Sequence, residues 1–288
     1  MTPKLFAPLS NIKQPPADAL WHHCSIGHDT HQTFLVDRQI GDVDLKLEIY
    51  DWREYFITVD GNETVSEHGK YCTGQDIISY CIDKQGVWEA EETAVQLAIL
   101  NEPQTDDKIM LDFGSHIGYY SMLAAKKGFQ VASFDSSKEN LELLQRSAVV
   151  NDVADKVHPY LCWLDDQAPI LSREAEKIRL AKVDIEGAEQ HALQMLADVI
   201  GGHKLKYLIM EISPTFNGTY PSIVETIAGQ HYSVYQIPTD KNWEHYEAFM
   251  ADPLTVLKEH CEIPAEGRKE YVAGLHQENF VFVRQDRG

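Results

Sequence analysis

The chain has 288 residues, enough for one large α/β domain or for a domain with an appended segment. Its hydrophobic fraction of 43% supports a sizeable core, and its formal net charge of −20 predicts an acidic surface. Such a surface repels phosphate groups, so the composition argues against nucleic acid and anionic membranes as partners and favours a small-molecule acceptor.

The cysteine content and the N-terminus indicate the compartment. Five cysteines are scattered along the chain without a Cys-x-x-Cys pair, as is typical of reduced thiols in a cytoplasmic protein. The N-terminus has no basic segment followed by an apolar core, and no run approaches the ~20 apolar residues of a membrane span. We therefore expect a cytoplasmic location. The sequence leaves homo-oligomerisation open.

The first 86 residues are predicted to form an N-terminal β-rich extension. Residues 1–32 contain four prolines and read as an arm, and the His-rich run at 21–28 lacks the spacing of a metal site. From residue 33 to 64 apolar and polar residues alternate, with Asp60-Gly61 as the clearest turn, which predicts a three-stranded antiparallel meander ending in a strand with Phe56. A helix capped by Thr73 is expected at 74–83.

Residues 87–288 alternate between strand-like and helix-like segments. A helix is expected at 89–100, and an insertion rich in aromatic and charged residues at about 239–276 is interpreted as a lid or partner surface. Strands that alternate with helices imply a mostly parallel sheet covered on both faces, and the last two strands suggest an antiparallel edge hairpin. The expected strands are 109–112, 130–134, 157–162, 180–184, 206–212, 231–237 and 279–284, and the expected helices are 118–127, 138–150, 188–199 and 221–229.

The segment from Met110 to Ser121 is the organising feature of this domain. An apolar run ends at Asp112 and passes through a turn with Gly114 and Gly118 into a helix, whose first N–H groups can bind an anionic or polar ligand. Asp112 stands at the first glycine position of a dinucleotide fingerprint, and the third glycine is missing. This pattern argues against a nicotinamide-dependent oxidoreductase, which is kept as an alternative.

A second strand ends at Asp135, 23 residues after Asp112. An acid about 20 residues past the first loop binds ribose hydroxyls in folds of this kind. Asp135 could instead be a turn residue or the cap of the next helix. The ribose role is favoured because the loop and the acid occur together.

A third motif, Lys182-Val-Asp-Ile-Glu-Gly-Ala-Glu189, completes a recognisable pattern. Together with Leu-Asp-Phe-Gly-Ser-His-Ile-Gly-Tyr-Tyr-Ser and with Phe134-Asp135 followed by Asn140-Leu141, it resembles the FkbM-type family of S-adenosylmethionine-dependent methyltransferases over roughly residues 87–284. The resemblance implies a Rossmann-like seven-stranded methyltransferase sheet, mostly parallel with one antiparallel edge strand. It also implies S-adenosylmethionine as cofactor and S-adenosylhomocysteine as product.

The resemblance also implies a set of cofactor contacts. The loop would wrap the methionine end, Asp135 would bind the ribose, and residues 163–165 would lie beside the adenine. An acid before the helix at 89–100 would lie near the cofactor entrance, although a first-turn acid favoured by the helix dipole is an equal alternative. Ser115-His116 departs from the usual Ala-Asn, so His116 either contacts the cofactor or faces the substrate. The implied set is Glu89, Asp112, Gly114, Ser115, His116, Gly118, Asp135, Ser136, Trp163, Asp165 and Asp184.

Methyl transfer needs an aligned nucleophile and a route for its proton. Asp184 and Glu186 are the leading candidates for a base, followed by Glu211 and His116. Crowded carboxylates raise one another's pKa and favour a cationic sulfonium. A divalent cation on the same carboxylates is not favoured, because the sequence forces no third ligand spacing. A purely structural alternative makes Asp184 the cap of the following helix.

The predicted activity is O-methylation of a hydroxyl on a sugar or a small natural product. The enzyme class follows from the ordered motifs, whereas the O-methyl preference is an analogy with the family. A non-catalytic cofactor-binding scaffold is the alternative outside enzymes.

Overall fold

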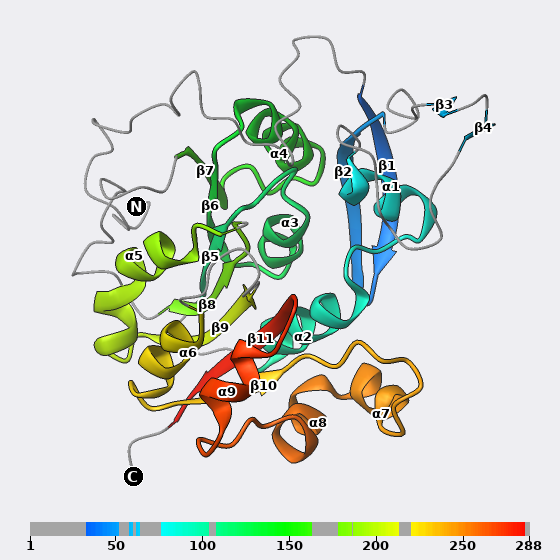
Figure 1. Cartoon of the computed structure of the whole chain (residues 1–288). Helices are drawn as coiled ribbons and strands as arrows, with labels where there is room; N and C mark the ends of the chain where they lie inside the picture. Colours follow the sequence, from blue (N-terminus) through cyan, green and yellow to red (C-terminus); the bar gives the residue numbers. More distant parts are fainter. Residues whose placement is uncertain are drawn as a thin grey trace.

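The computed structural model describes residues 33–51, 58–59, 62–63, 76–103, 108–162, 178–185, 187–212 and 220–285. Seven strands form a central sheet in the order β10-β11-β9-β8-β5-β6-β7 (Figure 1). Counted from β5, this is the doubly wound order 3-2-1-4-5-6 with the seventh strand inserted between the fifth and the sixth. It is the Rossmann-like methyltransferase fold expected from the sequence. The strands are β5 (Ile109–Phe113), β6 (Gln130–Asp135), β7 (Val157–Leu161), β8 (Ile178–Val183), β9 (Leu205–Ile212), β10 (Tyr232–Gln236) and β11 (Glu278–Arg284).

The edge of the sheet contains the expected antiparallel hairpin. Strand β11 runs antiparallel to both β9 and β10, so the reversed strand lies second from the edge and β10 is outermost. Residues 261–263 cover β10 with backbone hydrogen bonds, from Gln236 N to Cys261 O (3.1 Å) and from Ile263 N to Val234 O (2.8 Å). Exposed strand edges promote aggregation, and this segment satisfies the outer side of β10.

Helices cover both faces of the sheet, because each central strand is apolar on both sides (Figure 1). In β5, Met110 belongs to the core on one face, whereas Leu111 and Phe113 belong to the core on the other. The first face carries α2 (Ala90–Asn101), α3 (Tyr119–Lys126), α4 (Lys138–Val150) and α8 (Pro253–His260), and the second carries α5 (Glu189–Gly201), α6 (Tyr220–Ala228) and α9 (Arg268–Ala273).

The predicted insertion folds around the β10 edge. It contains α7 (Tyr246–Ala251), α8 and α9, of which α8 packs on α2 and α9 packs on α6. Arg268 of α9 pairs with Glu225 of α6 at 2.7 Å, and the Tyr246 hydroxyl of α7 donates to Glu91 of α2. Among the described helices, none is long and apolar enough to cross a bilayer.

The predicted three-stranded meander is wrong in its third strand. Strands β1 (Thr33–Ile40) and β2 (Val43–Tyr50) form a hairpin, while β3 (Thr58–Val59) pairs with β4 (Asn62–Glu63) in a separate sheet; Phe56 lies outside the described residues. The edge of β2 that does not pair with β1 is hydrogen-bonded to helices. Glu48 N donates to Ser147 Oγ of α4 (2.8 Å), and Tyr50 N donates to Ser79 Oγ of α1 (Ile77–Lys84; 3.1 Å). The hairpin therefore packs outside α3 and α4 (Figure 1).

The starts of the first two helices differ in detail from the prediction. Thr73 lies outside the described residues, and Asp76 is the cap of α1, accepting a hydrogen bond from Ile78 N at 3.2 Å. Glu89 precedes α2 in the left-handed region, at φ 41°, and its side chain makes no capping bond. This backbone conformation is uncommon for a residue with a side chain, and it aims Glu89 away from the helix start.

Gly114 is required by close packing between β5 and β8. Its φ is +82°, and an added Cβ would lie 1.7 Å from the carbonyl oxygen of Asp184. We expect Gly114→Ala to lower the free energy of unfolding by more than ~3 kcal/mol or to prevent folding. Asp184 N is hydrogen-bonded to Phe113 O (3.0 Å), so the two backbones cannot separate to relieve the clash without losing this bond.

The matched control is Gly128→Ala. Gly128 also has a positive φ, +89°, but an added Cβ there would meet nothing within 4 Å. Only backbone strain of about 1–2 kcal/mol is expected. Denaturant unfolding of both variants measures the difference, and equal losses would show that the Asp184 contact is unimportant.

Candidate active site

The carboxyl ends of the parallel strands bring distant acids to one edge of the sheet. Asp112 on β5 is the cross-strand partner of Lys182 on β8, and Asp184 follows two residues later on the same face. Glu211 on β9 comes one position after the Val183–Met210 pair, so it lies beside Asp184. The sheet register therefore places Asp112, Asp184 and Glu211 along one edge of the sheet.

A buried lysine lies at the centre of these acids. The Lys182 ammonium lies 2.8 Å from Asp184 Oδ2 and 3.4 Å from Glu92 Oε1 of α2, and the side chains of Lys182 and Glu92 are each 2% exposed. Asp112 and Glu89 complete the group, because both interact electrostatically with the same ammonium. We call Lys182 and these four carboxyl groups the Lys182 cluster.

Tyr120 of α3 holds the cluster from the helix side. The Lys182 ammonium lies 4.6 Å from the centroid of the Tyr120 ring, a cation–π geometry. The Tyr120 hydroxyl donates to Glu89 Oε2 at 2.9 Å, and Glu89 is also hydrogen-bonded to Asn279 of β11. Glu89 therefore faces the cluster, and it does not act as a first-turn acid of α2.

Burial shifts the pKa of nearly every member of the cluster in a predictable direction. It raises the pKa of Glu92 to about 8 and that of Asp112 to about 6, and it raises the pKa of Glu89 above its ordinary value. Burial opposes the charge of Lys182, but Asp184, Glu92, Glu89 and Asp112 together hold the pKa of Lys182 well above its ordinary value. At neutral pH the cluster thus contains a charged lysine and at least one neutral carboxyl group.

The loop after β5 is held by the end of β6. Gly114 N and Ser115 N both donate to Phe134 O (2.9 Å each), and His116 N donates to Asp135 Oδ2 at 2.7 Å. The other oxygen of Asp135 accepts from Ser137 N (2.8 Å) and from Asn140 Nδ2 (3.2 Å). Asp135 therefore ties the loop to the start of α4, whose cap is Ser137. Burial raises the pKa of this carboxyl group.

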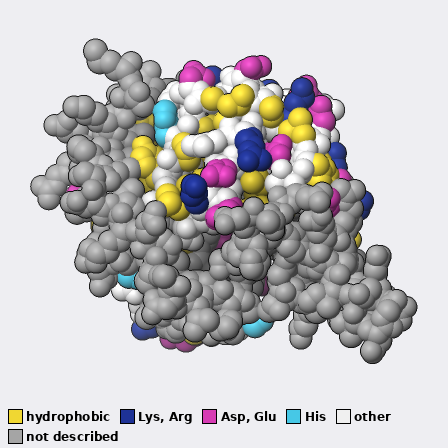
Figure 2. Space-filling view, turned by 90° about the horizontal axis from the view of Figure 1, so that it is seen from above, with side chains coloured by type: hydrophobic (Ala, Val, Ile, Leu, Met, Phe, Trp, Pro, Cys, Tyr) yellow, Lys and Arg dark blue, Asp and Glu magenta, His cyan; other side chains and the backbone are white. Residues whose placement is uncertain are grey.

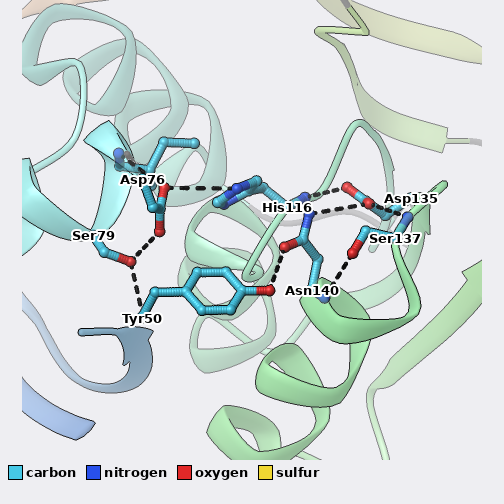
Figure 3. A network of polar contacts seen from close by, with 8 residues as sticks. Tyr50, Asp76, Ser79, His116, Asp135, Ser137 and Asn140 are labelled. Carbon is cyan, nitrogen blue, oxygen red and sulfur yellow. Dashed lines mark hydrogen bonds and ion pairs between the residues drawn. The ribbon is translucent and has the colours of Figure 1, made fainter. Parts of the chain in front are cut away.

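His116 connects the loop to the N-terminal extension. Figure 3 shows its ring pointing toward Asp76 while its backbone faces Asp135; Nε2 lies 3.7 Å from Asp76 Oδ1. Tyr50 of β2 donates to Asn140 Oδ1 at 2.8 Å and presents its ring edge to His116, with the centroids 6.4 Å apart. The N-terminal hairpin and α1 thus form one wall of the site.

Several buried polar atoms around the cluster have no hydrogen-bond partner within the described part of the chain. Nine side-chain atoms in those residues have this property. Six of them belong to residues of the cluster, to residues of the loop after β5, or to residues hydrogen-bonded to Glu89 or Tyr120. Buried polar groups are almost always paired, so this concentration offers hydrogen bonds to a water molecule or a polar ligand. The six are Glu92 Oε1, Gln96 Oε1, Asp112 Oδ1, Ser115 Oγ, His116 Nδ1 and Asn279 Oδ1.

The remaining predicted site residues have other surroundings. Glu211 is buried and accepts from Gln277 Nε2 at 2.5 Å. Ser136 is exposed, and Gly118 begins α3 with φ +88°, where an added Cβ would meet Leu144. Asp184 does not cap α5, whose first residues follow Ala188 without a side-chain cap. Trp163, Asp165 and Glu186 lie outside the described residues.

Four side chains of the site were not among the predicted site residues. In the sequence, Glu92 has the position of a first-turn acid of a helix, and Lys182 has that of a lysine at the end of a strand. Nothing in the sequence distinguishes Tyr120 or Asp76 from the residues beside them. The one available sign was that Lys182 is a charged residue in a mostly apolar strand, which also contains Arg179. Buried charges are usually paired, so this position called for acidic partners.

A separate cavity of about 670 Å³ lies in the insertion, between the end of β10, α9 and residues 260–264. Its walls include Trp243, Tyr271 and Asp240, and none of the predicted site residues lines it. Within the described residues, no three His, Cys, Asp or Glu side chains are grouped to hold a metal ion.

No family profile matches this sequence, and no curated protein matches it. Solved structures similar to the chain include an rRNA methylase from Streptococcus thermophilus (13% identity, 68% of this chain and 95% of that chain, TM-score 0.41). A second is an S-adenosylmethionine-dependent methyltransferase from Geobacter sulfurreducens in complex with S-adenosyl-L-homocysteine (16%, 72% and 97%, TM-score 0.38). A third is a 16S rRNA N2 G1207 methyltransferase from T. thermophilus in complex with AdoMet and guanosine (11%, 88% and 51%, TM-score 0.47).

Glu92 should make stability depend on pH. Its pKa is about 8 in the folded protein against an ordinary 4.5, so the folded state alone holds this proton between those values. Stability is then lost as the pH rises through this window, by at most about 1.4 kcal/mol per pH unit. In Glu92→Gln this loss is absent, so the variant should gain stability relative to the wild type as the pH rises from about 5 to about 8.

Urea unfolding at a series of pH values measures this effect. Glu91→Gln is the matched control, because Glu91 immediately precedes Glu92 in the same helix and accepts a hydrogen bond from Tyr246, outside the cluster. Parallel pH profiles for the wild type and Glu92→Gln would show that Glu92 is ionised in the folded protein throughout.

Proposed function

We propose that this chain is an S-adenosylmethionine-dependent methyltransferase that methylates a hydroxyl group of a sugar or a small natural product. The observation that carries the proposal is the concentration, at the Lys182 cluster and the loop after β5, of buried polar atoms that lack a hydrogen-bond partner among the described residues. This position is the carboxyl edge of the central strands, where open α/β sheets bind their ligands. The three ordered sequence motifs of the methyltransferase resemblance meet at the same edge.

The residues of the site fit this cofactor. The side-chain atoms Ser115 Oγ and His116 Nδ1, which have no hydrogen-bond partner among the described residues, are suited to the amino-acid end. The excess of carboxyl groups in the Lys182 cluster suits a ligand with a sulfonium and an ammonium group. Asp135 is the proposed ribose acceptor. Its carboxylate has about four acceptor positions, of which three are used by His116, Ser137 and Asn140, so one is left for a hydroxyl.

The cofactor supplies an electrophilic methyl group, and the chain supplies alignment and a proton acceptor. Asp184 is best placed for the second task, because its side chain is 22% exposed while Lys182 and Glu92 are each 2% exposed. A substrate hydroxyl entering from solvent thus meets Asp184 first. Lys182, at 2.8 Å, orients this carboxylate. Glu211 on the neighbouring strand and Glu186 are the second candidates for the base.

A small acceptor agrees with the charge of the molecule. The net charge of −20 disfavours polyanions. On the described part of the face in Figure 2, acidic and basic side chains are interspersed among apolar ones. Extended phosphate backbones are bound by clustered Lys and Arg residues, so this part of the surface offers them little.

Cofactor binding is the first test. Isothermal titration calorimetry should detect S-adenosylhomocysteine binding to the wild type, and Asp135→Asn should weaken it at least ~10-fold, because an amide nitrogen cannot accept from His116 N or from a ribose hydroxyl. Asp155→Asn, an exposed change on the surface, is the control.

Binding of NAD in place of S-adenosylhomocysteine would instead support the oxidoreductase alternative. Circular dichroism separates lost affinity from lost folding in Asp135→Asn, since Asp135 also holds the loop. An Asp135→Asn protein that is folded and binds S-adenosylhomocysteine with unchanged affinity would remove Asp135 from the ribose role.

Methyl transfer is the second test. Labelled S-adenosylmethionine is offered with a panel of monosaccharides and phenolic natural products, and with an RNA oligonucleotide as the competing acceptor class. In Asp184→Asn, turnover of the acceptor found should fall ~100-fold or more with cofactor affinity nearly unchanged, as expected for loss of a general base. If Asp184→Asn turns over the acceptor as fast as the wild type, Asp184 is not the base. If the wild type binds S-adenosylmethionine but methylates no acceptor of the panel, the scaffold alternative is favoured.

A further inference from the structure

The Lys182 cluster contains more acids than its lysine can neutralise. Helix α2 contributes Glu92, and Glu89 immediately precedes this helix. Strand β5 contributes Asp112, β8 contributes Lys182, and Asp184 immediately follows β8. The neighbouring elements add neutral groups, the Tyr120 hydroxyl from α3 and the Asn279 amide from β11. Four ionised carboxylates and one ammonium would give a net charge of −3 in a buried place. Like charges at close range favour proton uptake by one of them.

Glu92 is fully buried, and its charge is only partly compensated. Asp184 lies 2.8 Å from Lys182, Asp112 accepts from Ser121 Oγ at 2.5 Å, and Glu89 accepts from Tyr120. Glu92 Oε1 lies 3.4 Å from Lys182 and has no hydrogen-bond donor in the described part of the chain, and Glu92 shares the Tyr120 hydroxyl with Glu89. Among the contributions to its pKa, burial is the largest, and it disfavours the charged form of Glu92. The proton of the cluster therefore belongs on Glu92.

We propose that Glu92 releases this proton when a cationic group binds at the Lys182 cluster, so that uptake of S-adenosylmethionine is coupled to proton release at neutral pH. This inference rests on the proposed function. The step is balanced: the neutral carboxyl group becomes a carboxylate, the proton goes to the buffer, and the added positive charge is that of the ligand. A new cation near a carboxyl group favours its ionised form. A pKa of about 8 for Glu92 in the protein alone agrees with this assignment.

The two forms of the cofactor provide the contrast that the test needs. S-adenosylmethionine has a sulfonium, whereas S-adenosylhomocysteine has a neutral sulfur and otherwise the same polar groups. Proton release caused by the amino acid and nucleoside parts is therefore common to both ligands. The difference between them reports the response of the protein to the sulfonium charge alone.

Calorimetric titrations in buffers of different ionisation enthalpy give the number of protons released. Near pH 7.5, S-adenosylmethionine should release about 0.5–1 proton more than S-adenosylhomocysteine, because most of Glu92 is protonated before binding. Above about pH 9.5 the difference should disappear, since Glu92 is then already ionised. The affinity for S-adenosylmethionine relative to S-adenosylhomocysteine should rise with pH up to about pH 8 and then level off.

Two variants identify the group. In Glu92→Gln the difference in proton release should be lost, whereas in Glu91→Gln on the same helix it should equal that of the wild type. The wild-type affinity profile tests the same coupling without any variant, should Glu92→Gln fail to fold. If neither ligand binds, the proposed function itself fails. If both bind with equal proton release near pH 7.5, or if Glu92→Gln retains the difference, the coupling is overturned and the proposed function stands.

Discussion

The ammonium group of Lys182 is the interaction on which the site depends. It lies in a strand whose other residues are buried, and it joins acids from α2, β5 and β8 that mutual repulsion would otherwise keep apart. Burial of so many carboxyl groups is unfavourable unless they are paired. Removal of this one charge would leave four acids in a low-dielectric place. Lys182 thus links the acids at the start of α2 to the sheet, in addition to the apolar packing of Val95 and Ile99.

The loop after β5 and the Lys182 cluster are parts of one rigid unit. Asp184 N is bonded to Phe113 O, and the carbonyl of Asp184 fills the space left by the missing side chain of Gly114. Asp135 then fixes the other side of the loop through His116 N. The residues proposed for the cofactor and for proton acceptance are therefore positioned by the same backbone contacts, which suits a reaction that depends on alignment.

The sheet could be predicted from the sequence because its strands are apolar on both faces and alternate with amphipathic helices; the helix at 138–150 has the predicted bounds. The third strand of the meander could not be, because the edge of β2 is occupied by Ser147, which lies 99 residues away in the chain. Glu92 was missed for a different reason. Acids are favoured in the first turn of any helix, so its sequence position has an ordinary explanation, and its burial depends on tertiary packing.

Two features of α2 are unfavourable for the folded protein alone. Glu89 has left-handed backbone angles, and Glu92 is buried with an oxygen that lacks a hydrogen bond among the described residues. Strain of this kind persists where a site needs a group in a particular place. Both residues face the Lys182 cluster, so a bound cation would favour the charged forms that burial disfavours. A ligand that relieves an unfavourable arrangement of the folded state also stabilises that state. A fully compensated cluster would have little affinity for a further cation, so the excess of carboxyl groups beside α2 would contribute to the binding of a cationic ligand.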